Sequence, residues 1–280
     1  MTKSQSSVDS SQGAPVEEPE PAAPSSASSG RTRSIALRVG LLLAMSCALI
    51  SLGALLQWLS PGFGAFALTG LLFGALPVLV FGKGVWKQAW LNRSRPRLIL
   101  LGALVGLLNY VLTLMLHAVP LALFDLSAQD QAAVFEGLPL VERIGLVLAI
   151  CLAAPLFEEF AFRGVLQPRL AAHLTPRWAI LAAALCFAAI HFNLAGLGAI
   201  VELGLVLGLL AYWSGSLWPA IAAHAIHNIV TLIIFAIGSE ASETASISDL
   251  GNLSPWALGS FLLTANALRA FRAMARCAND

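Results

Sequence analysis

Long apolar stretches, each about the length of a bilayer-spanning helix, recur along most of the chain. They are apolar on all sides and do not alternate polar with apolar residues, so the pattern favours helices over the strands of a β-barrel. It predicts eight spans, at approximately 35–59, 64–82, 98–119, 143–166, 177–193, 196–213, 217–238 and 253–271. The chain is therefore predicted to be an all-α polytopic membrane protein, a bundle of about eight transmembrane helices.

The segment that precedes the first span has a different composition. It is rich in Ser, Pro, Ala and Glu, and such a segment buries too little apolar surface to offset the entropy of ordering it. We predict a disordered cytoplasmic tail over 1–33, N-terminal transmembrane helices and an acidic outer loop over 34–142, and a catalytic core over 143–238. Residues 239–280 would hold a second outer loop, the last transmembrane helix and a basic C-terminus.

Composition excludes two broad classes of protein. Hydrophobic residues make up 58% of the chain and charged residues only 11%, against roughly 25% in ordinary soluble proteins, so a soluble fold is excluded. The net charge of +1 provides no basic field, so nucleic acid is not an expected partner. The four cysteines have no CxxC spacing and are interpreted as packing residues without a disulfide framework.

The charges outside the spans divide by sign. With eight spans, four basic groups fall on one side of the membrane: Arg31, Arg33 and Arg38; Lys83, Lys87, Arg93, Arg95 and Arg97; Arg163, Arg169 and Arg177; Arg269, Arg272 and Arg276. The opposite loops hold mostly acidic residues: Asp125, Asp130, Glu136, Glu142, Glu240, Glu243 and Asp249. The positive-inside rule therefore predicts that both termini are cytoplasmic. Spans rich in Ala, Leu and Gly favour a multi-pass protein of a bacterial inner membrane, with the lipid bilayer around it.

A few ionisable or amide side chains lie inside the predicted spans, where each charged group costs about 2.5–3.5 kcal/mol to insert. They are Glu158, Glu159 and Arg163 in span four, His191 in span five, Glu202 in span six, and His224, His227 and Asn228 in span seven, with His117 near the end of span three. Glu202 has no partner nearby in the sequence, and it would either complete a polar cavity or bond to a neighbouring helix.

The spacing of these residues predicts which of them face one another. Glu159 and Arg163 are four residues apart, in the favoured order for a helical ion pair, which leaves Glu158 free to face a cavity. His224 and Asn228 are also four apart and share a helix face, whereas His227 is expected to point away from that pocket. Polar pairs of this kind also hold membrane helices together, so a purely structural role is the alternative.

Glu158, His191, His224 and Asn228 come from three predicted helices, and together they offer a carboxylate, two imidazoles and an amide. Such a group could activate a water molecule by general-base catalysis. It could equally hold Zn²⁺ through His191, His224 and Glu158, with an open position for water. Because buried Glu and His also mark proton relays, a transporter or proton-coupled permease is a competing hypothesis.

Three motifs in this order resemble those of the CPBP family: Glu158-Glu159-x-x-x-Arg163, Phe187-x-x-x-His191 and His224-x-x-x-Asn228. The family comprises type II CAAX prenyl endopeptidases and bacteriocin-processing or immunity proteases, and was once called the Abi family. The resemblance covers roughly 145–235. It implies an intramembrane endopeptidase that cleaves a membrane-associated peptide or protein, with an active site open toward the cytoplasm.

By the same resemblance, Glu158 is the general base or a metal ligand, and His191 works with it on the water. His224 and Asn228 bind metal or stabilise the oxyanion, and Glu159 and Arg163 are supporting residues. The resemblance allows both a Zn²⁺-dependent and a metal-free glutamate mechanism. A non-catalytic immunity or scaffold protein with the same fold is the remaining alternative.

Overall fold

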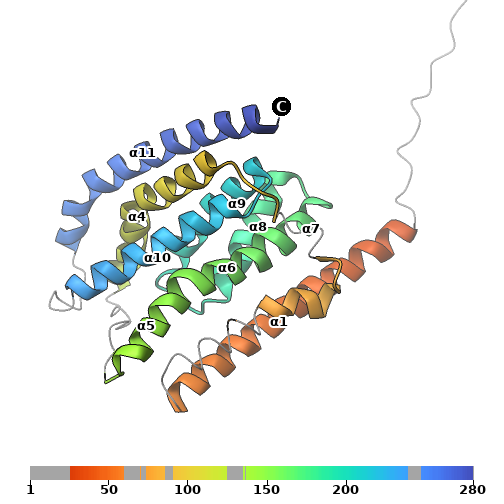
Figure 1. Ribbon diagram of the computed structural model, residues 1–280, viewed down its shortest axis with the longest axis horizontal. Helices are drawn as coiled ribbons and strands as arrows, with labels where there is room; N and C mark the ends of the chain where they lie inside the picture. The colour runs from red at the N-terminus through yellow and green to blue at the C-terminus, as the bar shows by residue number, and fades with distance from the viewer. Residues whose placement is uncertain are drawn as a thin grey trace, which may run out of the picture.

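The computed structural model describes residues 26–59, 70, 74–85, 91–124, 135, 137–238 and 247–279. Within these ranges the chain is helical and has no strand, which confirms the predicted all-α fold (Figure 1). The principal helices outside the Glu158 region are α1 (Ser26–Leu59), α4 (Pro96–Phe124), α8 (Pro176–Ala189), α9 (Leu197–Ser214), α10 (Trp218–Gly238) and α11 (Ile247–Asn279). Residues 74–81 are also helical.

The segment that carries Glu158 is one continuous helical rod from Leu140 to Ala171, and it changes helix type along its length. It runs through α5 (Leu140–Leu148), the π-helical segment η2 (Ala149–Ala153), α6 (Ala154–Glu159), the π-helical segment η3 (Phe160–Leu166) and α7 (Gln167–Ala171). Pro155 follows η2, and a proline inside a helix removes one backbone donor and locally disturbs the hydrogen-bond ladder. π-helical turns are frequent at functional sites, and the Glu158-Glu159 pair lies between these two.

The helices pack in layers, and α4 runs parallel to α10, since Gly102 and Gly106 of α4 face Pro219 and Ala223 of α10 in the same order. α4 packs between α11 and α10, and α9 packs against α8 (Figure 1). α1 lies on the other side of the rod, where Leu42 of α1 and Leu76 share a buried cluster with Phe162 of η3 and Phe187 of α8. The start of α1 and the ends of α7 and α11 lie at one end of the bundle, and the start of α5 lies at the other.

Four helices in the described part of the chain are long and apolar enough to cross a membrane. The candidate spans are Ala36–Gly53, Pro96–Leu121, Leu140–Ala171 and Leu197–Ser214. Two shorter apolar helices, Pro176–Ala189 and Trp218–Ile234, correspond to predicted spans five and seven. The protein is therefore a helical membrane protein, and the number of eight spans stays a prediction.

Two predicted boundaries differ from the observed helices. Residues 26–33, which we assigned to the disordered tail, already belong to α1, and residues 1–25 lie outside the described residues. The last proline of the tail is Pro24, and the sequence after it has no proline to stop the apolar helix from extending backwards. The other difference is in span five, where α8 ends at Ala189 and leaves His191 in a turn.

Two glycines of α4 allow an unusually close approach to α10. A Cβ atom at Gly106 would collide with the backbone carbonyl oxygen of Ala223, and one at Gly102 would collide with that of Pro219. Small residues at helix interfaces let membrane helices approach in this way. The contact holds α4 against the part of α10 that carries His224.

Gly106→Ala is therefore expected to destabilise the fold by about 1–3 kcal/mol, because backbone atoms cannot yield to the added methyl group. The matched control is Gly259→Ala in α11, where a Cβ atom meets nothing within 4 Å. Thermal unfolding of the purified protein in detergent measures both variants. Equal unfolding midpoints for Gly106→Ala and the wild type would show that the two helices can separate without cost.

Candidate active site

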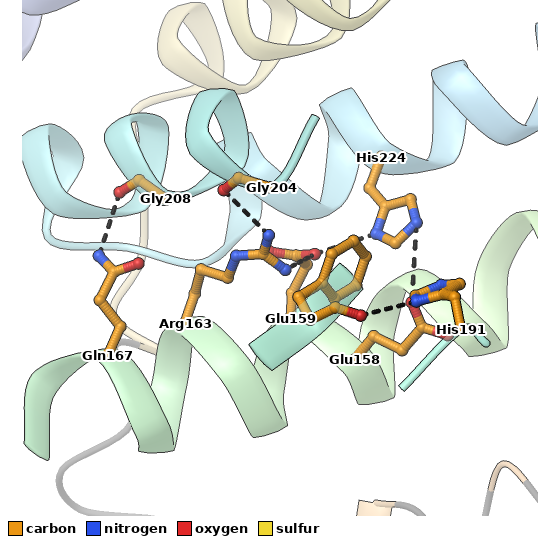
Figure 2. Close-up of polar contacts among 9 residues, drawn as sticks. Glu158, Glu159, Arg163, Gln167, His191, Gly204, Gly208 and His224 are labelled. Atoms are coloured by element: carbon orange, nitrogen blue, oxygen red, sulfur yellow. Dashed lines mark hydrogen bonds and ion pairs between the residues drawn. The ribbon is translucent and has the colours of Figure 1, made fainter. Parts of the chain in front are cut away.

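Glu159, the second glutamate of the pair, lies at the centre of a buried polar cluster (Figure 2). Its side chain and that of Arg163 are both 0% exposed, and Arg163 Nη1 donates to Glu159 Oε1 at 2.8 Å. The ion pair expected from their spacing is therefore present. The guanidinium also lies over the ring of Phe187, 4.4 Å from its centroid. Because both side chains are buried, these contacts are strong, and removing either partner is costly.

Arg163 and the next polar residue along the rod bind the backbone of α9. Arg163 Nη2 donates to the carbonyl of Gly204 at 3.1 Å, and Gln167 Nε2 donates to that of Gly208 at 3.1 Å (Figure 2). Without side chains, the two glycines leave these carbonyls accessible. The four-residue spacing of Gly204 and Gly208 therefore serves packing inside the molecule. Sequence reasoning missed Gln167, although it continues the four-residue spacing of Glu159 and Arg163.

His224 connects both glutamates. Its Nδ1 lies 3.0 Å from Glu159 Oε1, and its Nε2 lies 3.8 Å from Glu158 Oε2 (Figure 2). Because the carboxylate of Glu159 accepts, Nδ1 carries the proton and Nε2 keeps its lone pair. A carboxylate on one ring nitrogen fixes the tautomer and the orientation of a histidine. Glu159 thus orients His224, and the side chain of Glu158 is 21% exposed.

His191 lies just beyond the end of α8, in the turn that leads to α9. Its Nδ1 is 2.7 Å from the carbonyl oxygen of Phe187, so Nδ1 donates and Nε2 is left free. The next residue, Phe192, has a left-handed backbone with φ of 49°, which costs about 1–3 kcal/mol in a residue other than glycine. This strained residue turns the chain away from the helix axis directly after His191.

Asn228 binds the rod at its first π-helical segment. Its Nδ2 donates to the carbonyl oxygen of Ile150, in η2, at 2.8 Å. The amide has a second N–H and a carbonyl oxygen, which stay available for other partners. The contact holds α10 against the rod one helical turn away from His224.

A cavity of about 480 Å³ joins three of the four predicted catalytic residues. His191, His224 and Asn228 all line it, together with Phe187. Glu158 is not among the lining residues and reaches this space through His224, whose Nε2 it approaches. The structure therefore brings the three sequence motifs to one place.

The cavity wall also contains residues that the sequence did not assign to it. His227 lines the same cavity as His224, which corrects the expectation that it points away. Its ring packs against Tyr110 of α4, with centroids 5.3 Å apart, because α4 packs closely on this part of α10. His117, near the end of predicted span three, lines the cavity as well. The three-residue spacing of His224 and His227 on one helix could have indicated that both face the cavity.

Glu202, the buried charge without a partner in the sequence, binds the neighbouring helix. Its Oε2 accepts from Asn109 Nδ2 at 2.9 Å and from Thr113 Oγ1 at 3.1 Å, both in α4. The residue therefore joins α9 to α4, the second of the two roles predicted for it. Through Thr113, which lines the cavity, this cluster also supports the cavity wall.

The predicted metal ligands do not form a metal-binding group here. Among the described residues, no three His, Cys, Asp or Glu side chains gather closely enough to hold an ion. Glu158 and His224 approach each other, but His191 lies in the turn beyond α8 and points its Nδ1 at a backbone carbonyl. Zn²⁺ therefore stays a prediction of the sequence.

Comparison with known families agrees with the three motifs. Residues 140–230 match the family model of the Rce1-like type II CAAX prenyl endopeptidases, whereas a search of curated proteins found no match. The matched region begins at the first residue of the rod and ends two residues after Asn228, so it encloses the whole candidate site. Residues 140–230 are therefore similar to the Rce1-like type II CAAX prenyl endopeptidases, which agrees with the resemblance to the CPBP family that the three motifs predicted.

Proposed function

We propose that the protein is an intramembrane endopeptidase that hydrolyses a peptide bond of a membrane-associated peptide or protein. One observation carries the proposal: His191, His224 and Asn228 line a single cavity, and Glu158 approaches the free nitrogen of His224, inside a domain of a protease family. The apolar helices and the basic clusters support a multi-pass protein of the cell inner membrane.

Glu158 and His224 have the geometry to act on one water molecule. Their facing atoms, Glu158 Oε2 and His224 Nε2, are 3.8 Å apart, too far for a direct hydrogen bond but close enough for both to accept from the same water. Glu158 is the general base that takes the proton as the water oxygen attacks the carbonyl carbon of the substrate. Glu159 supports this step by holding the orientation of His224.

The remaining cavity residues serve the later steps. The second N–H of Asn228 stabilises the oxyanion, since the first is used on Ile150. When the intermediate collapses, the bond between carbon and nitrogen breaks, and Glu158 returns its proton to the leaving amine. His191, whose Nε2 is free, positions the water and the substrate at the cavity wall.

Substrate trapping tests this function. Cells in which Glu158→Gln replaces the wild-type protein are expected to accumulate an uncleaved peptide in their membranes, detected by mass spectrometry of membrane fractions. Glu142→Gln, at the start of the rod, is the matched loss of one carboxylate outside the site.

Two outcomes would contradict the proposal. An unchanged set of membrane peptides and an unchanged cellular phenotype in the Glu158→Gln strain would favour the non-catalytic scaffold. Solute uptake by reconstituted protein that persists in Glu158→Gln would favour a transporter.

A further inference from the structure

The cavity wall holds a second histidine of α10 that has no part in the proposed reaction. His227 lines the cavity three residues after His224, and it is 8% exposed. In the described part of the chain its Nδ1 is buried and makes no hydrogen bond. Unpaired N–H groups are rarer in protein interiors than unpaired acceptors, so the proton of the neutral ring belongs on Nε2. Nε2 is then the ring nitrogen that can donate to an occupant of the cavity.

The ring of His227 is held on the α4 side of the cavity. It packs on Tyr110 with the ring centroids 5.3 Å apart and the ring planes at 52°, and Tyr110 also lines the cavity. One helical turn before this pair, Gly106 of α4 meets the backbone of Ala223 of α10. Contact between the two backbones therefore fixes how far His227 stands from α4.

The other polar side chains around this ring already have partners inside the protein. Thr113 Oγ1 bonds to Glu202 Oε2 at 3.1 Å, and Thr231 Oγ1 donates to the backbone carbonyl of His227 at 2.9 Å. The side chain of Tyr110 hydrogen-bonds that of Thr231. His227 Nε2 is therefore the donor that this part of the wall leaves for an occupant.

The proposed reaction places the main chain of a substrate on the opposite side of the cavity. The peptide carbonyl that is attacked has to lie near Glu158, His224 and Asn228, and all three contact one another or the rod. His227 faces α4 instead of the rod. A substrate group that reaches His227 is therefore a side chain, which projects across the cavity from the main chain.

The wall also restricts the chemistry of that side chain. Among the described residues that line the cavity there is no Asp, Glu, Lys or Arg, so a charged side chain would lose its hydration without gaining a counter-charge. An apolar side chain would cover the N–H of His227 and leave it unpaired. A side chain with an uncharged oxygen acceptor, an amide or a hydroxyl, avoids both costs.

We propose that His227, supported by Tyr110, is a specificity-determining residue that selects a substrate side chain with an amide or a hydroxyl group. The inference rests on the proposed function, which supplies the peptide and the position of its main chain. The cavity of about 480 Å³ is in the size range of small-molecule sites, so it has room for such a side chain beside the catalytic water. A site that hydrogen-bonds a substrate group rejects analogues that lack it.

Binding of peptide probes to the inactive Glu158→Gln protein in detergent tests this proposal. The probes are capped, fluorescently labelled pentapeptides of alanine with glutamine, leucine, glutamate or lysine as the central residue, and fluorescence anisotropy gives each Kd. In the same background, His227→Phe keeps an aromatic ring on Tyr110 without a donor, and His227→Gln restores an N–H. His173→Phe is the matched control, because His173 is exposed and lies outside the cavity.

We expect the parent Glu158→Gln protein to bind the glutamine peptide roughly 10–100-fold more tightly than the leucine peptide, and also more tightly than the two charged peptides. His227→Phe should abolish the preference for glutamine over leucine, whereas His227→Gln and His173→Phe should keep it.

Three results would overturn the proposal: equal binding of the glutamine and leucine peptides or no binding by the parent protein, tighter binding of a charged peptide, or a preference that survives in His227→Phe. The ratios in the parent protein decide the matter even where His227→Phe does not fold. Because binding needs no bond cleavage, failure of this subsite is distinct from failure of the peptidase function, which the trapping experiment measures.

Discussion

Glutamine in place of Glu158 is expected to slow peptide-bond hydrolysis by roughly 10²–10⁴-fold, the usual contribution of a general base. The substitution keeps the shape of the side chain and its approach to His224, but an amide cannot take the proton of the attacking water. The measurement is the rate at which reconstituted protein cleaves the peptide that accumulates in the trapping experiment. Glu142→Gln is expected to keep the wild-type rate.

The neighbouring substitution separates the two glutamates. Glu159→Gln removes the carboxylate that orients His224 and pairs with Arg163, so it should lower both the cleavage rate and the unfolding midpoint. Glu158→Gln should leave the unfolding midpoint close to that of the wild type, because Glu158 is partly exposed. A Glu158→Gln protein that cleaves at half the wild-type rate would assign the base to another residue, with His191 the next candidate.

The helical architecture and the motif pairs follow from local sequence patterns. Continuous apolar stretches predict membrane helices because a lipid-exposed backbone must satisfy its hydrogen bonds internally. The ion pair of Glu159 and Arg163 was predictable for a similar reason, since residues four apart on a helix are neighbours whatever the rest of the fold does. The Rce1-like match to residues 140–230 agrees with the region that the motifs marked.

The contacts between distant segments could not be predicted in this way. Glu202 finds Asn109 and Thr113 about ninety positions away, and Asn228 finds a carbonyl of Ile150 in a π-helical segment. Such pairings depend on the rotation and depth of each helix, which packing contacts like that of Gly106 against Ala223 determine. The prediction for His227 was wrong for the same reason, because the sequence of one helix does not show how wide a cavity the neighbouring helices leave beside it.

Replacing Arg163 by methionine is expected to lower the free energy of unfolding by about 3–5 kcal/mol, the cost of leaving a buried charge without its partner. Arg163 is completely buried and links Glu159 to the backbone of Gly204, so methionine loses both contacts. Gln167→Met removes only a neutral hydrogen bond to Gly208 and should cost about 0.5–1.5 kcal/mol. Arg269→Met, an exposed arginine of α11, is the matched control and should change stability by no more than about 0.5 kcal/mol.

A double-mutant cycle shows whether the loss comes from the unpaired charge of Glu159. Glu159→Gln combined with Arg163→Met leaves no ion in the cluster, so the double variant should be more stable than the sum of the two single losses allows. Titration of detergent micelles with a denaturing detergent gives the free energy of unfolding for all four proteins. Simple additivity would mean that Arg163 acts through its hydrogen bond to Gly204 and its packing on Phe187. Coupling would mean that the charge of Glu159, which also orients His224, is tolerated inside the membrane only because Arg163 neutralises it.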